Sequence, residues 1–272
     1  MSLRAGQVWE QGEPYERYVG RWSRLVAREF LDWLGVAPGA AWLDVGSGTG
    51  ALSETILRVS APRSVTGVDS AEGFVEHARA AVPGASFVVG DAQELPFEDA
   101  CFDAVVSGLV LNFVPDPGHA VAELTRVARP GGAIAAYVWD YAGRMELMRY
   151  FWDAAGELDP AARDLDEGIR FRALDGGGLE RLFSAADQAE VSSRAIDVPT
   201  IFRDFDDYWE PFLGGQGPAP AYVASLDGTH RAQLRELLRG RLPTGGDRSI
   251  RLVARAWAVR GVSRARRAAA RT

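Results

Sequence analysis

Hydrophobic and polar residues alternate along the first half of the chain in a pattern that predicts strands and helices in turn. Short apolar runs predict buried strands at 41–45, 64–68, 86–89, 102–107 and 133–139. Apolar positions at helical spacing predict helices between them, at 51–59, 71–81 and 118–128. Such alternation implies right-handed crossovers and therefore an α/β fold with a doubly wound, mostly parallel sheet.

Local signals place the ends of several of these elements. A helix from Ser23 is predicted by the apolar positions Leu25, Val26, Phe30, Leu31 and Leu34, and Gly35 is placed to stop it. Ser70 is placed to cap the helix at 71–81. The run Arg129-Pro130-Gly131-Gly132 predicts a helix stop and a turn before the fifth strand.

The regular alternation ends after Asp140. A mostly helical segment at 141–186 and a polar, aromatic segment at 202–247 surround a strand-like stretch at 191–198, and 250–259 predicts the last strand. We interpret the chain as one domain made of an N-terminal helical segment (1–36), a core (37–140), two helical cap insertions (141–186 and 202–247), a last strand (248–260) and a basic tail (261–272).

Three alternating glycines follow the first predicted strand directly. Gly46, Gly48 and Gly50 stand between the strand at 41–45 and the helix at 51–59. Glycine allows positive φ and the close approach of a ligand to the backbone, so a strand, a glycine turn and a helix N-terminus together predict a nucleotide cradle. Taken alone, Gly46-x-Gly48-x-x-Ala51 also resembles a dinucleotide-binding fingerprint.

Acidic residues stand at or just beyond three predicted strand ends. Asp44 precedes the glycine loop, Asp69 ends the second strand, and Asp91 follows the third. Ligands of open α/β sheets bind beyond the carboxyl ends of the strands. A carboxylate at Asp69 suits the two hydroxyls of a ribose, and one at Asp91 suits the amino group of a base.

Composition narrows the class of protein. The chain has 272 residues, 47% of them hydrophobic, but no apolar run approaches the roughly 18 residues of a membrane span. The start, Met1-Ser2-Leu3-Arg4, lacks the apolar segment of a secretory signal, and Cys101 is the only cysteine. We therefore expect a cytoplasmic protein without a disulfide framework or a metal cluster.

Charge gives two further indications. All 30 basic residues are arginine, which excludes a lysine Schiff base or a P-loop lysine. The net charge is −7 although the tail from Arg260 carries arginines and no acid. An acidic body argues against a nucleic-acid partner.

Several motifs occur together in the order and spacing of one family. They are Asp44-x-Gly46-x-Gly48-x-Gly50, Asp69, Gly90-Asp91-Ala92, Leu95-Pro96-Phe97, Phe102-Asp103 and Arg129-Pro130-Gly131-Gly132. Over about 40–140 the chain resembles class I S-adenosylmethionine-dependent methyltransferases, most closely the branch of small-molecule and ubiquinone/menaquinone-type enzymes. The resemblance implies a seven-stranded Rossmann-like sheet.

The resemblance also implies roles for individual residues. The residues implied to bind S-adenosylmethionine are Arg21, Asp44, Gly46, Ser47, Gly48, Gly50, Asp69, Ser70, Asp91, Ala92, Gln93 and Ser107. Asp69 would hold the ribose hydroxyls, Asp91 the adenine amino group, and Asp44 the methionyl amino group. Arg21 would pair with the methionyl carboxylate. S-adenosylhomocysteine would be the product.

The methyl acceptor is less clearly indicated. Residues at the ends of the fourth and fifth strands and in an aromatic helical stretch are candidates for its pocket: Asn112, Trp139, Tyr141, Tyr208 and Trp209. The aromatic stretch at 202–212 also suits packing of the cap. Asp140 is a candidate base or a helix cap, and His119 is a candidate base or a solvated side chain.

We hypothesise that the chain transfers a methyl group from S-adenosylmethionine to a small, partly apolar acceptor, mainly through positioning and desolvation. Two other classes stay open. A binding module without catalysis would keep the glycine loop but transfer nothing, and a nicotinamide oxidoreductase would bind NAD(P)H instead. The oxidoreductase requires neither Asp44 nor Asp91.

Overall fold

A seven-stranded sheet forms the centre of the fold. The computed structural model describes residues 20–214 and 217–264. The strands lie in the order β3-β2-β1-β4-β5-β7-β6, the first five being parallel and β7 antiparallel. Their bounds are β1 (Ala41–Val45), β2 (Ser64–Asp69), β3 (Ser86–Val89), β4 (Phe102–Gly108), β5 (Ala128–Trp139), β6 (Ala189–Phe202) and β7 (Ile250–Val262).

Helices connect the strands. The α-helices are α2 (Arg21–Leu34), α3 (Ala51–Val59), α4 (Glu72–Ala81), α5 (Pro117–Val127), α6 (Glu146–Leu158), α7 (Glu167–Arg170), α8 (Gly176–Ala185), α9 (Phe205–Trp209), α10 (Pro218–Ser225) and α11 (Gly228–Arg241). Short 3₁₀ helices are η3 (Leu111–Phe113), η4 (Pro160–Leu165), η5 (Arg172–Leu174) and η6 (Glu210–Leu213).

The chain divides into two compact units. Among the described residues, unit 1 comprises 20–26, 139–175, 196–214 and 217–256, and unit 2 comprises 27–138, 176–195 and 257–264. Unit 1 contains most of the two predicted cap insertions together with residues 20–26, 139–140, 196–201 and 248–256, whereas α8 belongs to unit 2.

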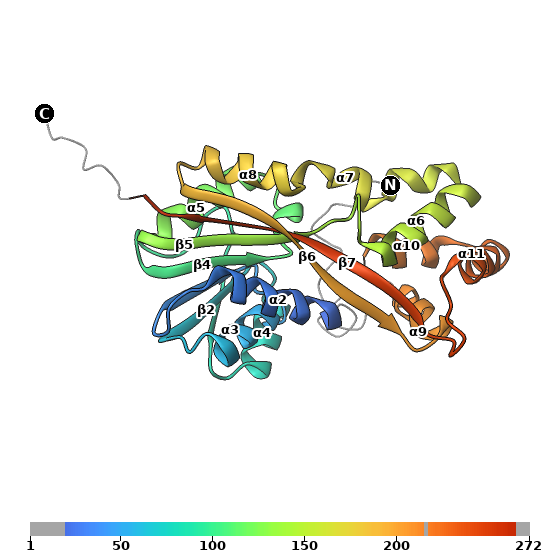
Figure 1. Cartoon of the computed structure of the whole chain (residues 1–272), viewed down its shortest axis with the longest axis horizontal. Coiled ribbons are helices and arrows are strands. Elements are labelled where there is room, and N and C mark those ends of the chain that lie inside the picture. Colours follow the sequence, from blue (N-terminus) through green and yellow to red (C-terminus); the bar gives the residue numbers. More distant parts are fainter. Residues whose placement is uncertain (1–19, 215–216, 265–272) are drawn as a thin grey trace, which may run out of the picture. The chain divides into compact units, whose positions relative to one another are not determined.

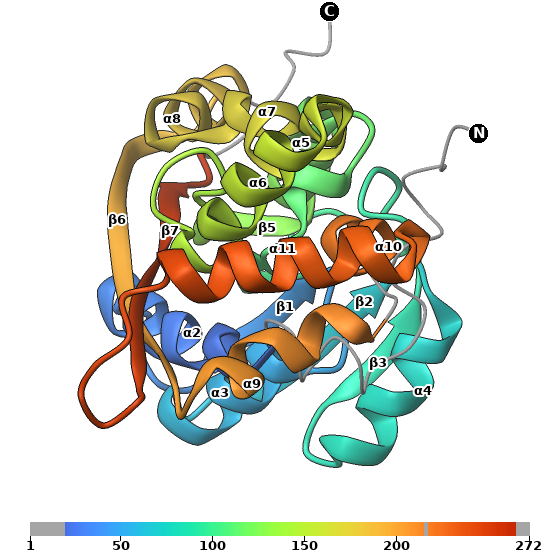
Figure 2. The same cartoon turned by 90° about the vertical axis from the view of Figure 1, so that its right-hand side faces the viewer.

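Unit 2 contains β1 to β4 and the helices that pack on them. All five residues of β1 are buried, as expected of a parallel strand covered on both faces. In Figure 1, α5 and α8 lie on one side of β4 and β5, and α3 and α4 lie on the other. Figure 2 shows α4 beside β3, against which it packs. In the β1–β2 register Asp44 stands opposite Gly67 and Val45 opposite Val68, so the carboxyl ends of these strands are level.

Unit 1 has an aromatic core of its own. Phe151 of α6 stacks on Phe212 of η6 at 4.5 Å between ring centroids, and Tyr208 of α9 lies 5.4 Å from the same Phe212 ring. The side chains of all three are fully buried. These rings are large enough to hold the short helices of this unit together by burial alone.

Most predicted elements are confirmed. The strands at 41–45 and 86–89 and the helix at 51–59 have the predicted bounds. The other helices and strands before β5 differ by one or two residues at an end, whereas β5 begins five residues before the predicted strand at 133–139. β6 and β7 are longer than the predicted strands at 191–198 and 250–259. The predicted seven-stranded, mostly parallel sheet is confirmed.

Two local predictions are wrong. Ser70 does not cap α4, because the helix begins one residue later, with Ala71 at the N-cap position. The run Arg129-Pro130-Gly131-Gly132 follows the end of α5 at Val127, as the predicted helix stop requires, but it is not a separate turn. It lies inside β5, where Gly131 has φ +79° and the pairing with β4 shifts register. The segment 1–19 and the tail 265–272 lie outside the described residues.

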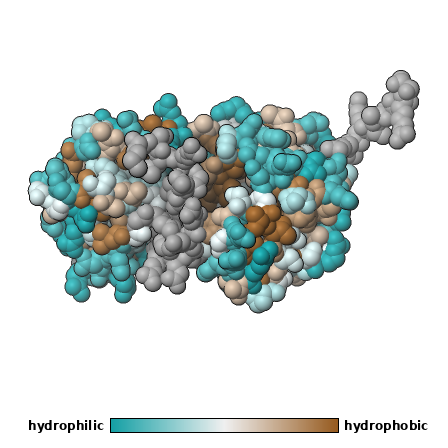
Figure 3. Space-filling model, turned by 180° about the vertical axis from the view of Figure 1, so that it is seen from behind, coloured by the Kyte–Doolittle hydropathy of each residue, from teal (hydrophilic) through white to brown (hydrophobic). Residues whose placement is uncertain are grey.

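Figure 3 shows small groups of hydrophobic residues on a largely hydrophilic face. Within residues 20–214 and 217–264, no helix combines the length and the apolar character that crossing a bilayer demands.

Candidate cofactor site

Backbone hydrogen bonds fix the glycine loop against β2. The N–H groups of Gly46 and Ser47 both donate to the carbonyl of Val68, at 2.7 and 3.0 Å. The N–H of Gly50 donates to the carbonyl of Ser47, which closes a tight turn just before α3. All three glycines have positive φ, of +72°, +51° and +90° in chain order. The loop therefore has a defined shape that other residues rarely adopt.

The glycines of this loop serve different purposes. A Cβ at Gly46 would lie 2.3 Å from a methyl carbon of Val110, so this glycine lets the loop pack on the segment after β4. A Cβ at Gly48 would meet nothing within 4 Å. Gly48 thus leaves open space beside the backbone, which is what a ligand needs in order to approach.

Asp44 lies beneath the loop and is only 1% exposed. Its Oδ2 accepts a hydrogen bond from the Ser53 hydroxyl at 2.7 Å, whereas its Oδ1 is buried without a partner. Burial, with a smaller effect of the nearby Asp69 charge, raises the pKa of Asp44 to about 7. A half-satisfied carboxyl in this position is suited to a cationic or hydrogen-bond-donating group of a ligand.

Asp69 is held in place by the backbone at the end of β2. Its Oδ2 accepts from the N–H of Gly48 and its Oδ1 from the N–H of Ala71, both at 2.9 Å. Burial raises the pKa of Asp69 in spite of these two bonds. The carboxylate therefore has a fixed orientation beside Gly48, with lone pairs left for hydroxyl donors.

The segment after β3 is more exposed. Asp91 is exposed, and its Oδ1 accepts from the N–H of Gln93 at 2.8 Å. The Oε1 of Gln93 accepts from the N–H of Asp116 at 3.0 Å, which ties this segment to the start of α5. Ala92 and Gln93 are half-buried, and Ser70 is exposed. Their predicted contacts with a cofactor stay predictions.

Further polar groups of unit 2 are buried without a partner. They include the Oγ atoms of Ser47 and Ser107 and the Oδ1 of Asn112. Ser107 lies near the end of β4, the strand that pairs with β1, and Asn112 follows that strand in η3. A buried polar group without a partner costs about 1–3 kcal/mol. Together with Asp44 Oδ1 and the open flank of Gly48, these atoms fit a polar ligand such as an amino-acid-bearing nucleoside.

The comparison with known families agrees with this geometry. Residues 43–136 match the family described as "Methyltransferase domain". The match spans β1 to β5 and includes Asp44, the glycine loop, Asp69 and Asp91. This part of the chain belongs to the class I S-adenosylmethionine-dependent methyltransferases.

Individual relatives resemble the chain over different lengths. The demethylmenaquinone methyltransferase of Renibacterium salmoninarum is 40% identical over 114 residues, which are 42% of this chain and 46% of that protein. An uncharacterized 37.1 kDa protein in a transposon of Streptomyces fradiae is 35% identical over 214 residues, 75% of this chain and 60% of that one. The chain thus spans about half the length of the curated relatives that it matches.

A solved structure shows the same fold. Phosphoethanolamine N-methyltransferase 2 of Haemonchus contortus, in complex with S-adenosyl-L-methionine, superimposes with a TM-score of 0.60 at 14% identity. The match covers 97% of this chain and 60% of that one. At this identity the likeness is evidence of fold alone.

The two candidate bases have different surroundings. His119 is exposed in the first turn of α5, where its N–H donates to Asp116. Asp140 is half-buried in unit 1, and its two carboxylate oxygens accept from the N–H groups of Gly143 and Arg144 at 3.0 Å. Asp140 therefore stabilises the turn before α6 and does not cap that helix, whose N-cap residue is Met145. Catalysis by either residue stays a prediction.

The other acceptor candidates belong mostly to unit 1. Trp139 is 3% exposed with its indole N–H unpartnered, and the ring of Tyr141 lies 5.6 Å from that of Phe171. Tyr208 is fully buried and donates its hydroxyl to the carbonyl of Leu147. Trp209 is 5% exposed. For Tyr208 and Trp209 these surroundings favour packing, and contact with an acceptor stays a prediction.

Sequence patterns did not indicate three contributors to the loop. Ser53 binds Asp44 from α3, and Val110 packs on Gly46. Leu109 adopts φ +65°, which turns the chain at the end of β4. A serine in the first turn of a helix, like Ser53, and an apolar residue after a strand, like Val110, occur too often to indicate a binding site. Nothing in the sequence indicates that Leu109 adopts positive φ.

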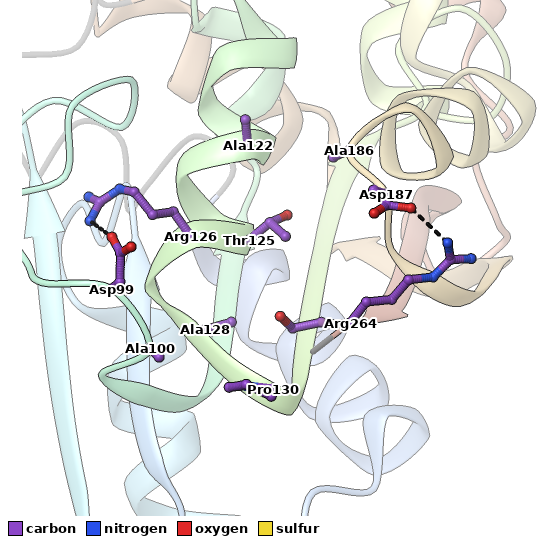
Figure 4. Close-up of a pocket in the computed structure, with 11 residues that line it drawn as sticks. Asp99, Ala100, Ala122, Thr125, Arg126, Ala128, Pro130, Ala186, Asp187 and Arg264 are labelled. Atoms are coloured by element: carbon purple, nitrogen blue, oxygen red, sulfur yellow. Dashed lines mark hydrogen bonds and ion pairs between the residues drawn. The ribbon is translucent and has the colours of Figure 1, made fainter. Parts of the chain in front are cut away.

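A large cavity in unit 2 lies elsewhere. It has a volume of about 1100 Å³ and lies where α5 ends and β5 begins, at the amino ends of the parallel strands (Figure 4). Its charged side chains are paired with one another, Arg126 with Asp99 and Arg264 with Asp187. No predicted site residue lines it. Ligands of this fold bind at the opposite ends of the strands.

Proposed function

We propose that the chain binds S-adenosylmethionine in unit 2 and transfers its methyl group to a small, partly apolar molecule. One observation carries this proposal: buried acceptors without partners and fixed carboxylates gather at the carboxyl ends of β1, β2 and β4, beside the open flank of Gly48. The methyltransferase family of residues 43–136 supports it.

The residues present fit each polar part of the cofactor. Asp69 would hold the ribose hydroxyls, since the backbone fixes its carboxylate in place. Asp44 Oδ1 would take the methionyl amino group, and Ser47 and Ser107 would complete the polar surroundings. Asp91 would bind the adenine amino group, with Ser70, Ala92 and Gln93 beside it. The resemblance implies Arg21 for the methionyl carboxylate, but Arg21 belongs to unit 1, whereas the other cofactor candidates belong to unit 2.

The chain contributes mainly position and exclusion of water. When bound, the cofactor supplies a methyl group on a positively charged sulfur that is a good leaving group. The rigid glycine loop fixes the direction of attack, because an in-line displacement depends on alignment. A base is needed only where the acceptor is a phenol, an alcohol or an ammonium ion, and Asp140 and His119 are the candidates.

The nature of the acceptor is part of the proposal. The relative from Renibacterium salmoninarum acts, by its name, on demethylmenaquinone. Its similarity supports an acceptor with an apolar body, but the shared region of 114 residues is the cofactor-binding part. The acidic net charge of −7 supports a small molecule over nucleic acid.

Calorimetric titration with S-adenosylhomocysteine tests the proposal. The wild type should bind, and Asp69→Ala should weaken binding about 100-fold, because two hydrogen bonds to a charged group are lost. Asp32→Ala, at an exposed acid of α2, is the matched control and should bind as the wild type does. Absence of binding to the wild type, or enhanced NAD(P)H fluorescence instead, would contradict the proposal.

Transfer itself needs a second measurement. Tritiated S-adenosylmethionine incubated with a panel of quinols, phenols, amines and organic acids should label at least one of them. Binding of S-adenosylhomocysteine without any labelling would favour a cofactor-binding module without catalysis.

A further inference from the structure

Unit 1 contains a group of buried hydrogen-bond donors that have no acceptor within residues 20–214 and 217–264. They are Nε and Nη2 of Arg21, Nε1 of Trp22 and the hydroxyl of Thr200. Trp22 is 7% exposed and Thr200 is fully buried. Phe202 joins them, because it follows Thr200 on the same buried face of β6 and its ring centroid lies 5.6 Å from that of Trp22.

Arg21 is held in a fixed orientation. Its Nη1 donates to Asp207 Oδ1 at 3.2 Å, and its guanidinium carbon lies 4.3 Å above the Trp22 ring and 4.7 Å above the Phe202 ring. Asp207 is shared with Arg203, whose Nε lies 3.6 Å from Oδ2.

The free edge of Arg21 has a specific chemistry. In a guanidinium group, Nε–H and one Nη2–H point along the same edge and match the two oxygens of a carboxylate. Asp207 binds Nη1, and neither Nε nor Nη2 has a partner among the described residues. The aromatic rings on the guanidinium provide an apolar rim, which suits an anion attached to an apolar body.

We infer that unit 1 binds the carboxylate of the methyl acceptor through Arg21, Trp22 and Thr200, and that the acceptor is an organic acid with a partly apolar body. The inference rests on the proposed function. The acceptor is favoured over the cofactor as the source of the carboxylate because all other cofactor-binding candidates lie in unit 2.

Carboxylate probes test the inference. Benzoate and acetate are titrated into the full-length protein with and without S-adenosylhomocysteine, by saturation-transfer NMR and calorimetry, with benzamide as the neutral analogue of benzoate. Benzoate should bind the wild type and benzamide about tenfold more weakly. Arg21→Gln should weaken benzoate binding about tenfold and leave benzamide unchanged, since only the charged, two-donor contact is lost.

Two further variants keep the test independent of folding. Thr200→Val replaces an unpartnered buried hydroxyl with a methyl group, so its melting temperature should not fall while benzoate binds a few-fold more weakly. Arg28→Gln removes an exposed arginine from the same helix, α2, and should change nothing.

Three results would overturn the inference. The first is no saturable binding of either carboxylate to the wild type, and the second is equal binding by Arg21→Gln. The third is an Arg21→Gln variant that binds S-adenosylhomocysteine more weakly but its decarboxylated analogue as well as the wild type does, because the carboxylate is then that of the cofactor. If S-adenosylhomocysteine fails to bind the wild type, the proposed function fails, and the titrations without it still test the carboxylate site.

Discussion

At the scale of single residues, the cofactor site contains a carboxyl group, Asp44, whose charged form burial disfavours. It also contains two glycines, Gly46 and Gly48, that should tolerate substitution to different degrees. Asp44 is enclosed beneath the loop with one oxygen unsatisfied, and Asp69 is fixed by two N–H groups. Gly46 faces the filled side of the loop and Gly48 the open side. Each of these contrasts leads to a measurable difference.

Asp44 makes stability depend on pH. Its pKa is 3.8 in the unfolded chain and about 7 in the folded one, so the folded state holds an extra proton between these values. Stability therefore falls as pH rises from 4 to 7 and then levels off. The Asp44→Asn variant has no such titration, so its unfolding free energy should not fall with pH in this way. The difference in unfolding free energy between Asp44→Asn and the wild type should therefore grow in favour of the variant by up to about 4 kcal/mol between pH 4 and pH 8. Urea denaturation at both pH values measures it, and a constant difference would contradict the burial argument.

Gly46→Ala and Gly48→Ala should differ. Both place a Cβ on a residue with positive φ, but only at Gly46 does the new atom collide with Val110. We expect Gly46→Ala to lower stability by about 2–4 kcal/mol and Gly48→Ala by about 1 kcal/mol. Val110→Ala in the Gly46→Ala background should recover part of the loss. Denaturant unfolding of the four proteins is the measurement, and absence of any recovery would remove the role assigned to Val110.

At the scale of elements, the sequence predicts best where an apolar run is buried on both faces. β1 is such a run, and its bounds are those predicted. β6 was predicted too short at both ends, since it begins two residues before the predicted stretch at 191–198 and continues through Pro199 to Phe202. Proline is unfavourable inside a strand, so Pro199 gives no signal that the strand continues. The Pro-Gly-Gly run signalled a turn, but Ala128 and Ala133 on either side of it pair with β4. A hydrogen bond from the Gly131 N–H to the Ser263 carbonyl holds the run itself in β5. Tertiary pairing overrides local preference here.

The residues of the candidate site also differ in how far the sequence predicts them. Asp44, Asp69 and the glycines stand at the ends of strongly patterned strands, so fold rules locate them. Ser53 and Val110 contribute through contacts that no spacing encodes. In unit 1, the free edge of Arg21 depends on Asp207, which lies 186 residues away in the chain. A single sequence does not report such long-range pairs.

The short helix α7 contains a second buried acid. Glu167 is 2% exposed and accepts a hydrogen bond from the indole N–H of Trp152 in α6, and burial raises its pKa from 4.5 to about 7. Glu167→Gln keeps an acceptor for Trp152 without the charge, so above pH 7 it should stabilise the protein by up to about 3 kcal/mol. Glu167→Ala should destabilise it by about 1–3 kcal/mol at pH 5, because the indole N–H loses its acceptor. Urea titrations at pH 5 and pH 8 distinguish these effects, and a stabilising Glu167→Ala would contradict them.

At the scale of the whole molecule, the two units share continuous elements. The division falls between Val26 and Ala27 inside α2, between Ala195 and Ile196 inside β6, and between Ala256 and Trp257 inside β7. No unit is a single stretch of chain. Each unit therefore contains strands or helices that are completed by residues assigned to the other unit.

Unfolding should accordingly be a single event. Loss of β6 or β7 removes part of both units, so differential scanning calorimetry of the full chain should show one transition with a calorimetric to van't Hoff enthalpy ratio near 1. The Asp69→Ala variant should shift this transition without splitting it. Two separated transitions, or a ratio well above 1, would contradict the coupling.

The passage of β6 and β7 through both units has a consequence for changing the acceptor. Specificity in many enzymes is exchanged by transplanting a loop or an insertion whose ends lie in flexible connections. Here the residues assigned to the carboxylate, Arg21 and Thr200, stand on a helix and a strand that continue into the cofactor-binding unit. Acceptor specificity should therefore be changed by point substitutions within α2 and β6. A segment exchanged from another protein would have to be joined in the middle of a helix or a strand.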